Sequence, residues 1–229
     1  MNDILSRLKV VLEKIAHEAH TAGRAPSQVG LVAVSKSQPP ENVRLAFDAG
    51  QLVFGENRAQ ELSAKAPLLP ASVQWHFIGH LQKNKIRKVL PLVELIHAVD
   101  SVELAQEIDR IASELGLFPR VLLEVNVSGE GSKFGFSPDV IRRSAAVLLS
   151  LRRVQVEGLM TIAPIVDHSD DARPFFAALR MLRDEMAAEH NVGLPILSMG
   201  MSGDFGAAIS EGATLVRIGT AIFGERPKP

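Results

Sequence analysis

The chain has 229 residues, 46% of them hydrophobic, and a formal net charge of −1 at pH 7, which suits one globular domain with a sizeable core. So small a net charge gives no general field for attracting nucleic acid or an anionic membrane, and any anion site must therefore be local. The absence of cysteine excludes disulfide bonds and thiolate metal ligands, and the absence of tyrosine excludes a phenol as catalytic acid or base.

The N-terminal segment begins with a predicted helix. Apolar residues recur at helical spacing from Ile4 to Ala19, Asp3 is a candidate N-cap, and Gly23 ends the pattern. The segment mixes charge into its apolar positions, unlike a signal peptide, and no stretch approaches the roughly 18 apolar residues that span a bilayer. We expect a cytoplasmic protein without membrane contact.

Strand and helix patterns alternate through the rest of the chain. An apolar run at 30–35 precedes a helical stretch that Pro39 and Pro40 open. Further runs follow at 52–54, 74–78, 95–99, 121–127, 154–160, 195–198 and 214–218. Such runs, separated by helices, predict an α/β fold in which residues 1–229 form a single (β/α)8 TIM barrel domain. An open doubly wound sheet is the alternative. The N-terminal helix should cover the gap left after the last strand.

Reactive residues of such barrels lie where strands end, and Lys36 directly follows the first apolar run. Partial desolvation and nearby cations would lower the pKa of this lysine and expose a neutral amine that can attack an aldehyde. The alternative is a lysine that extends from the strand end into solvent.

Two glycine-containing turns follow the last two predicted strands. The first, SMGMSGD at 198–204, contains Ser202, and the second, RIGTA at 217–221, contains Thr220. Backbone N–H groups and hydroxyls at this place favour a phosphate site, although each turn alone could be an ordinary helix start. Arg217 lies within a buried strand and must have a partner, either Glu124 or an acceptor atom on a ligand.

Other polar groups give weaker indications. His76 and His80 lack the spacing and the carboxylate of a metal site. The basic residues between Lys83 and Lys88 most often form a solvated helix face, with a local anion or RNA contact as the alternative. Residues 129–136 are rich in glycine and read as a mobile loop in which Lys133 is either a lid cation or simply exposed.

Several of these segments are motifs through which the chain resembles the pyridoxal phosphate homeostasis protein family. The motifs are LVAVSK at 31–36, FGENRAQE at 54–61, WHFIGHLQKNK at 75–85, EVNVSGEGSKFGF at 124–136, GLMTI at 158–162, LSMGMSGDF at 197–205 and VRIGTAIFG at 216–224. The resemblance runs almost end to end. It implies the barrel of fold type III pyridoxal phosphate enzymes, which is shared with the N-terminal domain of alanine racemase.

The resemblance also implies roles for particular residues. Lys36 would carry pyridoxal 5'-phosphate as a Schiff base, and Arg217 would face the pyridine nitrogen. The phosphate would be held by Ser202, Gly203, Gly219 and Thr220, and the pocket neighbours would be Asn57, His80, Met160 and Met201. An arginine opposite the ring nitrogen disfavours protonation there and weakens the ring as an electron sink.

The function implied by the resemblance is to hold and deliver the cofactor, without turnover, to pyridoxal phosphate-dependent apo-enzymes. It needs no metal and no nucleic acid, and a monomer is expected. One alternative is an amino-acid racemase, but alanine-racemase-like enzymes use a tyrosine base and an added C-terminal β domain, and this chain has neither. A second alternative is a cofactor-free Schiff-base aldolase that uses Lys36.

Overall fold

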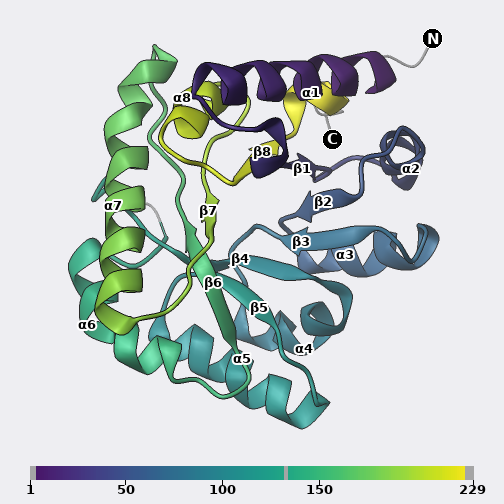
Figure 1. The fold of residues 1–229 in the computed structure, drawn as a ribbon. Coiled ribbons are helices and arrows are strands. Elements are labelled where there is room, and N and C mark those ends of the chain that lie inside the picture. Colours follow the sequence, from purple (N-terminus) through teal and green to yellow (C-terminus); the bar gives the residue numbers. More distant parts are fainter. Residues whose placement is uncertain (1–3, 132–133, 225–229) are drawn as a thin grey trace.

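The computed structural model describes residues 4–131 and 134–224, and Figure 1 shows them as a ribbon. Eight parallel strands form a closed barrel in sequence order, and β8 pairs with β1. The strands are β1 (Gly30–Val34), β2 (Val53–Glu56), β3 (Gln74–Phe77), β4 (Leu95–Val99), β5 (Arg120–Glu124), β6 (Gln155–Met160), β7 (Ile196–Ser198) and β8 (Leu215–Ile218). Closure confirms the predicted TIM barrel and excludes the open sheet.

Helices surround the barrel in Figure 1. They are α1 (Ile4–Thr21), α2 (Pro40–Asp48), α3 (Ala59–Lys65), α4 (Ile86–Val89), α5 (Val102–Leu115), α6 (Pro138–Leu149), α7 (Arg173–His190), α8 (Phe205–Ser210) and α9 (Thr220–Phe223). Capping residues fix several ends. Ser101 and Ser137 accept N–H bonds at the starts of α5 and α6, and Gly116 ends α5 in the left-handed conformation.

The N-terminal helix α1 lies in the helix layer next to β8, where it was predicted to cover the gap left after the last strand. It packs against α2, α8 and α9, and Figure 1 shows it lying beside β8 and α8. Its buried side chains, among them Leu8 and Ile15, recur at the spacing that places them on one face. The candidate N-cap Asp3 lies outside the described residues. None of the described helices is long and apolar enough to cross a membrane.

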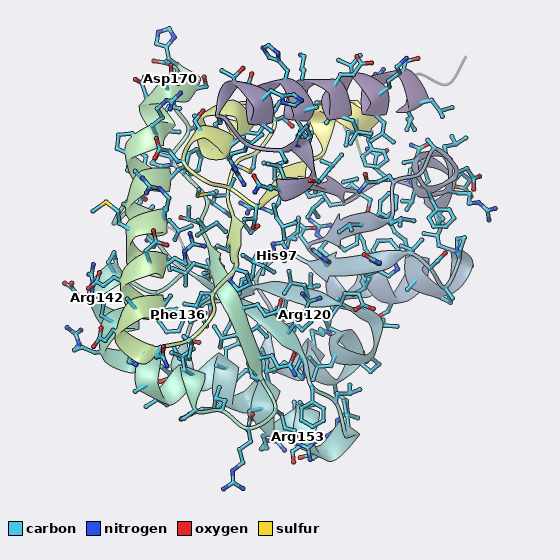
Figure 2. All side chains as sticks on the ribbon, in the orientation of Figure 1. His97, Arg120, Phe136, Arg142, Arg153 and Asp170 are labelled. Atoms are coloured by element: carbon cyan, nitrogen blue, oxygen red, sulfur yellow. The ribbon has the colours of Figure 1, made fainter. Side chains whose placement is uncertain are left out.

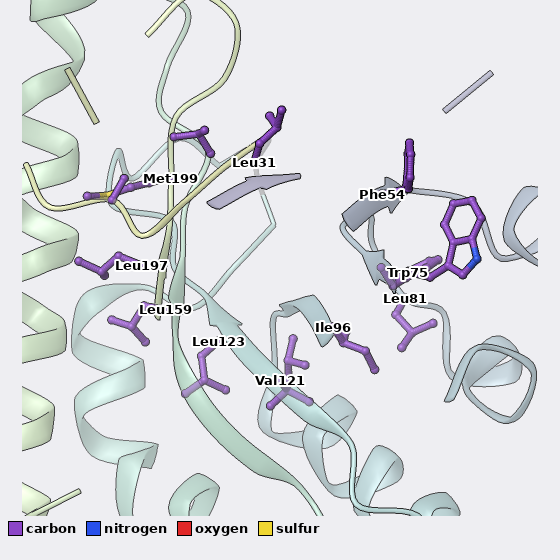
Figure 3. Close-up of a cluster of buried hydrophobic side chains, with 14 of the residues drawn as sticks. Leu31, Phe54, Trp75, Leu81, Ile96, Val121, Leu123, Leu159, Leu197 and Met199 are labelled. Carbon is purple, nitrogen blue, oxygen red and sulfur yellow. The ribbon is translucent and has the colours of Figure 1, made fainter. Parts of the chain in front are cut away.

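Apolar side chains fill two layers. The larger layer lies between the barrel and the helices, where outward-facing residues such as Phe54, Ile96 and Leu159 are buried (Figure 3). A smaller cluster inside the barrel contains Leu95, Ala98, Leu122 and Met160. This inner cluster fills the barrel interior away from the C-terminal ends of the strands. A cavity that could hold a ligand therefore lies at those C-terminal ends.

Candidate functional site

A cavity of about 480 Å³ opens at the C-terminal ends of the strands. Most of the residues predicted for the site line it, namely Lys36, Asn57, His80, Met201, Ser202, Gly203, Arg217, Gly219 and Thr220. These residues come from strands at both ends of the sequence, and barrel closure brings them together. The remaining lining residues were not singled out as pocket residues from the sequence, and they include Val34, Gln38, Gly79, Glu124, Phe134 and Ile162.

Met160 is the predicted pocket residue that the structure does not place at the cavity. Its side chain is fully buried in the inner cluster with Leu95 and Leu122. Alternation along the strand turns Met160 inward one layer below the mouth, whereas Ile162, two residues further on, lines the cavity. A sequence motif gives the direction of a side chain but not its depth in the barrel.

The backbone on both sides of Lys36 is held by side chains of α3. Nζ of Lys65 donates to the carbonyl oxygen of Ser35 at 2.8 Å, and the N–H of Ser37 donates to Oε2 of Glu61 at 2.7 Å. Ser37 has a φ of 61°, in a region that residues other than glycine seldom adopt. The helix thus fixes a strained turn that places Lys36, which is half-buried, on the cavity wall.

A buried ion pair stabilises the same turn from behind. Oε1 of Glu56 accepts from Nζ of Lys65 at 2.6 Å and from Oγ of Ser35 at 2.7 Å. Burial raises the pKa of Glu56, and the lysine opposes this shift. The pair joins β2 to α3 and was not predicted, although Glu56 lies in the family motif at 54–61.

The two predicted phosphate turns lie at the same end of the cavity. Gly200 has a φ of 91°, and a Cβ at this position would lie 2.6 Å from Cβ of Ala208, so the turn after β7 requires glycine. Oδ1 of Asp204 accepts from the N–H of Met201 at 2.6 Å and closes the turn. Ser202 and Thr220 remain exposed at the mouth.

Arg217 lies at the cavity floor with hydrogen bonds on its inner side. Nη1 donates to Oγ of Ser198 at 2.6 Å, and Nη2 donates to the carbonyl oxygen of Thr161 at 2.8 Å. Burial lowers its pKa to about 10, while the charges of Glu124 and Asp204 oppose the shift. Among the described residues Arg217 forms no ion pair with Glu124 and donates instead to Ser198 and Thr161. The other expected partner, an acceptor atom on a ligand, stays a prediction.

An acidic group faces Arg217 across the cavity. Burial raises the pKa of Glu124 to about 7, the charge of Asp100 adds to the shift, and Arg217 and His80 oppose it. Nδ1 of His80 lies 2.8 Å from Oδ2 of Asp100, and the ring of Phe134 stacks on the imidazole with centroids 4.2 Å apart. Glu124 is therefore a proton acceptor or donor close to neutral pH.

The weaker sequence indications have separate outcomes. His76 contacts His97 rather than His80, and the part of the chain that the structure describes contains no group of three residues able to hold a metal ion. Within the basic cluster, Lys83, Arg87 and Lys88 are exposed, as a solvated face would be. Lys133 lies outside the described residues.

Comparisons with known proteins agree with the fold and the motifs. The family model for the N-terminal domain of alanine racemase matches residues 10–227. The pyridoxal phosphate homeostasis protein of Aquifex aeolicus is 47% identical over 96% of this chain and 97% of that protein, and the protein of the same name from Escherichia coli K12 is 40% identical over 99% and 98%.

Solved structures give the same result. PipY of Synechococcus elongatus, in the structure with PLP bound, superposes with a TM-score of 0.82 at 41% identity, covering 92% of this chain and 100% of PipY. An alanine racemase from Clostridium difficile, at 18% identity and a TM-score of 0.76, shares the fold over 97% of this chain and 58% of its own length. The chain belongs to the pyridoxal phosphate homeostasis protein family, whose barrel is that of the N-terminal domain of alanine racemase.

Proposed function

We propose that this protein binds pyridoxal 5'-phosphate on Lys36 as a Schiff base and holds it for other proteins, without turning over a substrate of its own. The observation that carries the proposal is the meeting of Lys36, Arg217 and the two small-residue turns at Ser202 and Thr220 around one cavity. An amine, a cation and hydroxyls are the groups that complement an aldehyde, a pyridine nitrogen and a phosphate.

The residues present fit such a ligand. A Cβ built on Gly203 meets no atom within 4 Å, so the turn leaves open space beside the hydroxyl of Ser202 for a phosphate. Oδ1 of Asn57 is buried without a hydrogen-bond partner among the described residues, and a ligand hydroxyl would satisfy it. The cavity of about 480 Å³ lies within the range of small-molecule sites.

Each side chain has a defined task in this proposal. Lys36 would hold the cofactor covalently, because its amine would condense with the cofactor's aldehyde and release water. Ser202, Gly203, Gly219 and Thr220 hold the phosphate by hydroxyl and backbone N–H groups. Arg217 would donate to the ring nitrogen and disfavour its protonation, which would weaken the cofactor's capacity to delocalise a carbanion. The chain also contains no tyrosine to act as the second racemase base.

Absorption spectroscopy tests the proposal. Purified protein mixed with pyridoxal 5'-phosphate should develop the visible band of a Schiff base, and borohydride reduction should attach the cofactor to the peptide that contains Lys36. Lys36→Ala should lose both signals, while Lys88→Ala, which changes an exposed lysine, should retain them. A colourless wild-type protein, or a label on another lysine, would overturn the assignment.

The two enzyme alternatives give different results. A racemase would convert L-alanine to a racemic mixture, which chiral chromatography detects, and sustained turnover would replace the carrier function. An aldolase would cleave a phosphorylated sugar without added cofactor and would stay colourless with pyridoxal phosphate. The site favours neither alternative. The chain contains no tyrosine to act as the racemase base. An aldolase without the cofactor would have no pyridine nitrogen for Arg217 to contact.

We further propose that the recipients are pyridoxal phosphate-dependent apo-enzymes and that the carrier is a monomer. Loaded protein should reactivate an apo-enzyme in the presence of a phosphatase that destroys free cofactor, whereas an equal amount of free cofactor should not. Reactivation that the phosphatase abolishes would contradict protected delivery. Light scattering coupled to size exclusion measures the oligomeric state.

A further inference from the structure

A chain of buried polar groups crosses the barrel interior below the cavity. Nε2 of His97 lies 2.9 Å from Nδ1 of His76, and Nδ1 of His97 lies 2.9 Å from Oγ of Ser198, which in turn accepts from Nη1 of Arg217 at 2.6 Å. The four side chains come from β3, β4, β7 and β8. His97 and Ser198 are fully buried, and Figure 2 shows His97 at the centre of the barrel.

We infer that His76, His97 and Ser198 are positioning residues that hold the guanidinium of Arg217 at the cavity floor. They form a relay of hydrogen bonds in which every donor points in the same direction along the relay. The inference rests on the proposed function for its consequence at the ligand, because a clamped Arg217 presents its remaining N–H groups to the ring nitrogen. The relay itself is a property of the ligand-free protein.

The direction follows from what each group can donate. Arginine has no acceptor, so Ser198 must accept from Arg217. If Nδ1 of His97 accepts the serine proton, Nε2–H of His97 then donates to Nδ1 of His76, and every proton in the relay has an acceptor. In the opposite direction the imidazole would donate to Ser198, and the serine proton would have no acceptor among the described residues.

The imidazoles must be neutral for this relay to hold. Burial lowers the pKa of His76 to about 4, with the charge of Arg120 adding to the shift. The pKa of His97 is also lowered, first by burial and then by His76 and Arg217. A single positive charge therefore remains in the relay, and it stays on Arg217, the residue at the ligand end.

The outer end of the relay reaches the opposite side of the barrel. His76 is 7% exposed, and Arg120, whose positive charge acts on it, is the first residue of β5, which places this end near the N-terminal side of the strands. Thr161 completes the clamp by accepting from Nη2 of Arg217, and its own hydroxyl donates to the carbonyl oxygen of Val125 at 2.7 Å. Both terminal nitrogens of the guanidinium are thus fixed from inside.

Nitrogen NMR of the ligand-free protein tests the direction of the relay. At neutral pH His76 and His97 should both be neutral with the proton on Nε2, and His97→Asn should identify the resonances. A protonated Nδ1 on His97, or a charged imidazole at that position, would overturn the relay. This measurement does not depend on pyridoxal phosphate, so it remains decisive if the proposed function is wrong.

Spectroscopy of the loaded protein tests the clamp. Ser198→Ala should weaken pyridoxal phosphate binding by roughly tenfold or more, as expected for the loss of a hydrogen bond to a charged group. Ser198→Ala should also shift the absorption maximum of the bound cofactor, and the midpoint of its pH titration, in the same direction as Arg217→Met does. The double variant should move them no further than Arg217→Met alone, since the serine would act through the arginine. Additive shifts would overturn the clamp.

Variants at His97 separate positioning from packing. His97→Phe retains the volume but removes the acceptor for Ser198, so the spectrum should change. His97→Asn retains an acceptor near the position of Nδ1 and should restore the spectrum even though it leaves a void. Leu148→Ala, in a buried position on α6, should lower the thermal midpoint without moving the spectrum. If the shift of the spectrum parallels the loss of thermal stability in all three variants, the relay has only a structural role.

Discussion

Lys65 and Glu56 form a buried ion pair behind the turn that carries Lys36, with 2.6 Å between Nζ and Oε1. Their side chains are 8% and 0% exposed, so removal of one partner leaves an uncompensated charge in the protein interior. Such a loss costs about 3–5 kcal/mol. We expect Lys65→Met to lower the free energy of unfolding, measured in urea, by an amount of that order.

An exposed pair supplies the control. Nε of Arg44 lies 2.8 Å from Oδ1 of Asp48 one helical turn away, and both side chains are more than half exposed. Arg44→Met should therefore cost less than about 1 kcal/mol. Adding Glu56→Gln to Lys65→Met should recover part of the loss, because it removes the unpaired charge. Equal losses in the two single variants would show that burial does not strengthen the pair.

The stability of the protein should depend on pH through Glu124. Its pKa in the folded protein is about 7, against an ordinary value of 4.5. Because the folded state raises the pKa, the stabilisation from the protonated carboxyl is fully present below the ordinary value and is lost as the pH rises towards neutrality. Ionisation at neutral pH therefore destabilises the fold.

Comparison with Glu124→Gln isolates this effect from other titrating groups, including Asp100 and His80 beside it. The variant should gain about 2–3 kcal/mol relative to the wild type between about pH 5 and about pH 8. Urea unfolding at the two pH values measures the gain. A difference between the proteins that stays constant with pH would mean that Glu124 titrates at its ordinary value.

The order of strands and helices and the positions of the strand ends could be predicted because they depend on local patterns. Apolar runs of strand length, alternating with helices, favoured the barrel over the open sheet, and Lys36, Ser202 and Thr220 could be located because reactive groups follow strands. These inferences need only the order of elements along the chain.

Contacts across the barrel could not be predicted in this way. Ser198 and His97 are 101 residues apart on strands that are not neighbours, and their contact depends on register and on the depth of each side chain in the interior. The same ignorance of depth explains the wrong placement of Met160 at the cavity. The hydrogen bonds of Arg217 with Ser198 and Thr161 could not be predicted for the same reason.

Gly79 should prove necessary for ligand binding, because a Cβ at this position would lie 2.4 Å from the carbonyl oxygen of Asn57 and 2.7 Å from its Cα. Gly79→Ala must push Asn57 away from its place on the cavity wall. We expect the dissociation constant for pyridoxal phosphate, measured by absorbance titration, to rise by about tenfold or more.

A matched glycine tests whether this effect is local. A Cβ on Gly193, in the loop before β7, meets no atom within 4 Å. Gly193→Ala should leave the dissociation constant unchanged and stabilise the protein slightly by restricting the unfolded chain. Unchanged affinity in Gly79→Ala would show that Asn57 can move without consequence for the ligand.

The covering role of α1 can be tested with two leucines on the same helix. Leu8 is 2% exposed and Leu12 is 44% exposed, so Leu8→Ala leaves a cavity against the barrel while Leu12→Ala removes mainly solvated atoms. The first should cost about 2–5 kcal/mol and the second about 0.5 kcal/mol or less in urea unfolding. Alanine is at least as good a helix former as leucine, so a loss in Leu8→Ala must come from packing rather than from helix propensity. Equal small losses in the two variants would contradict the covering role of α1.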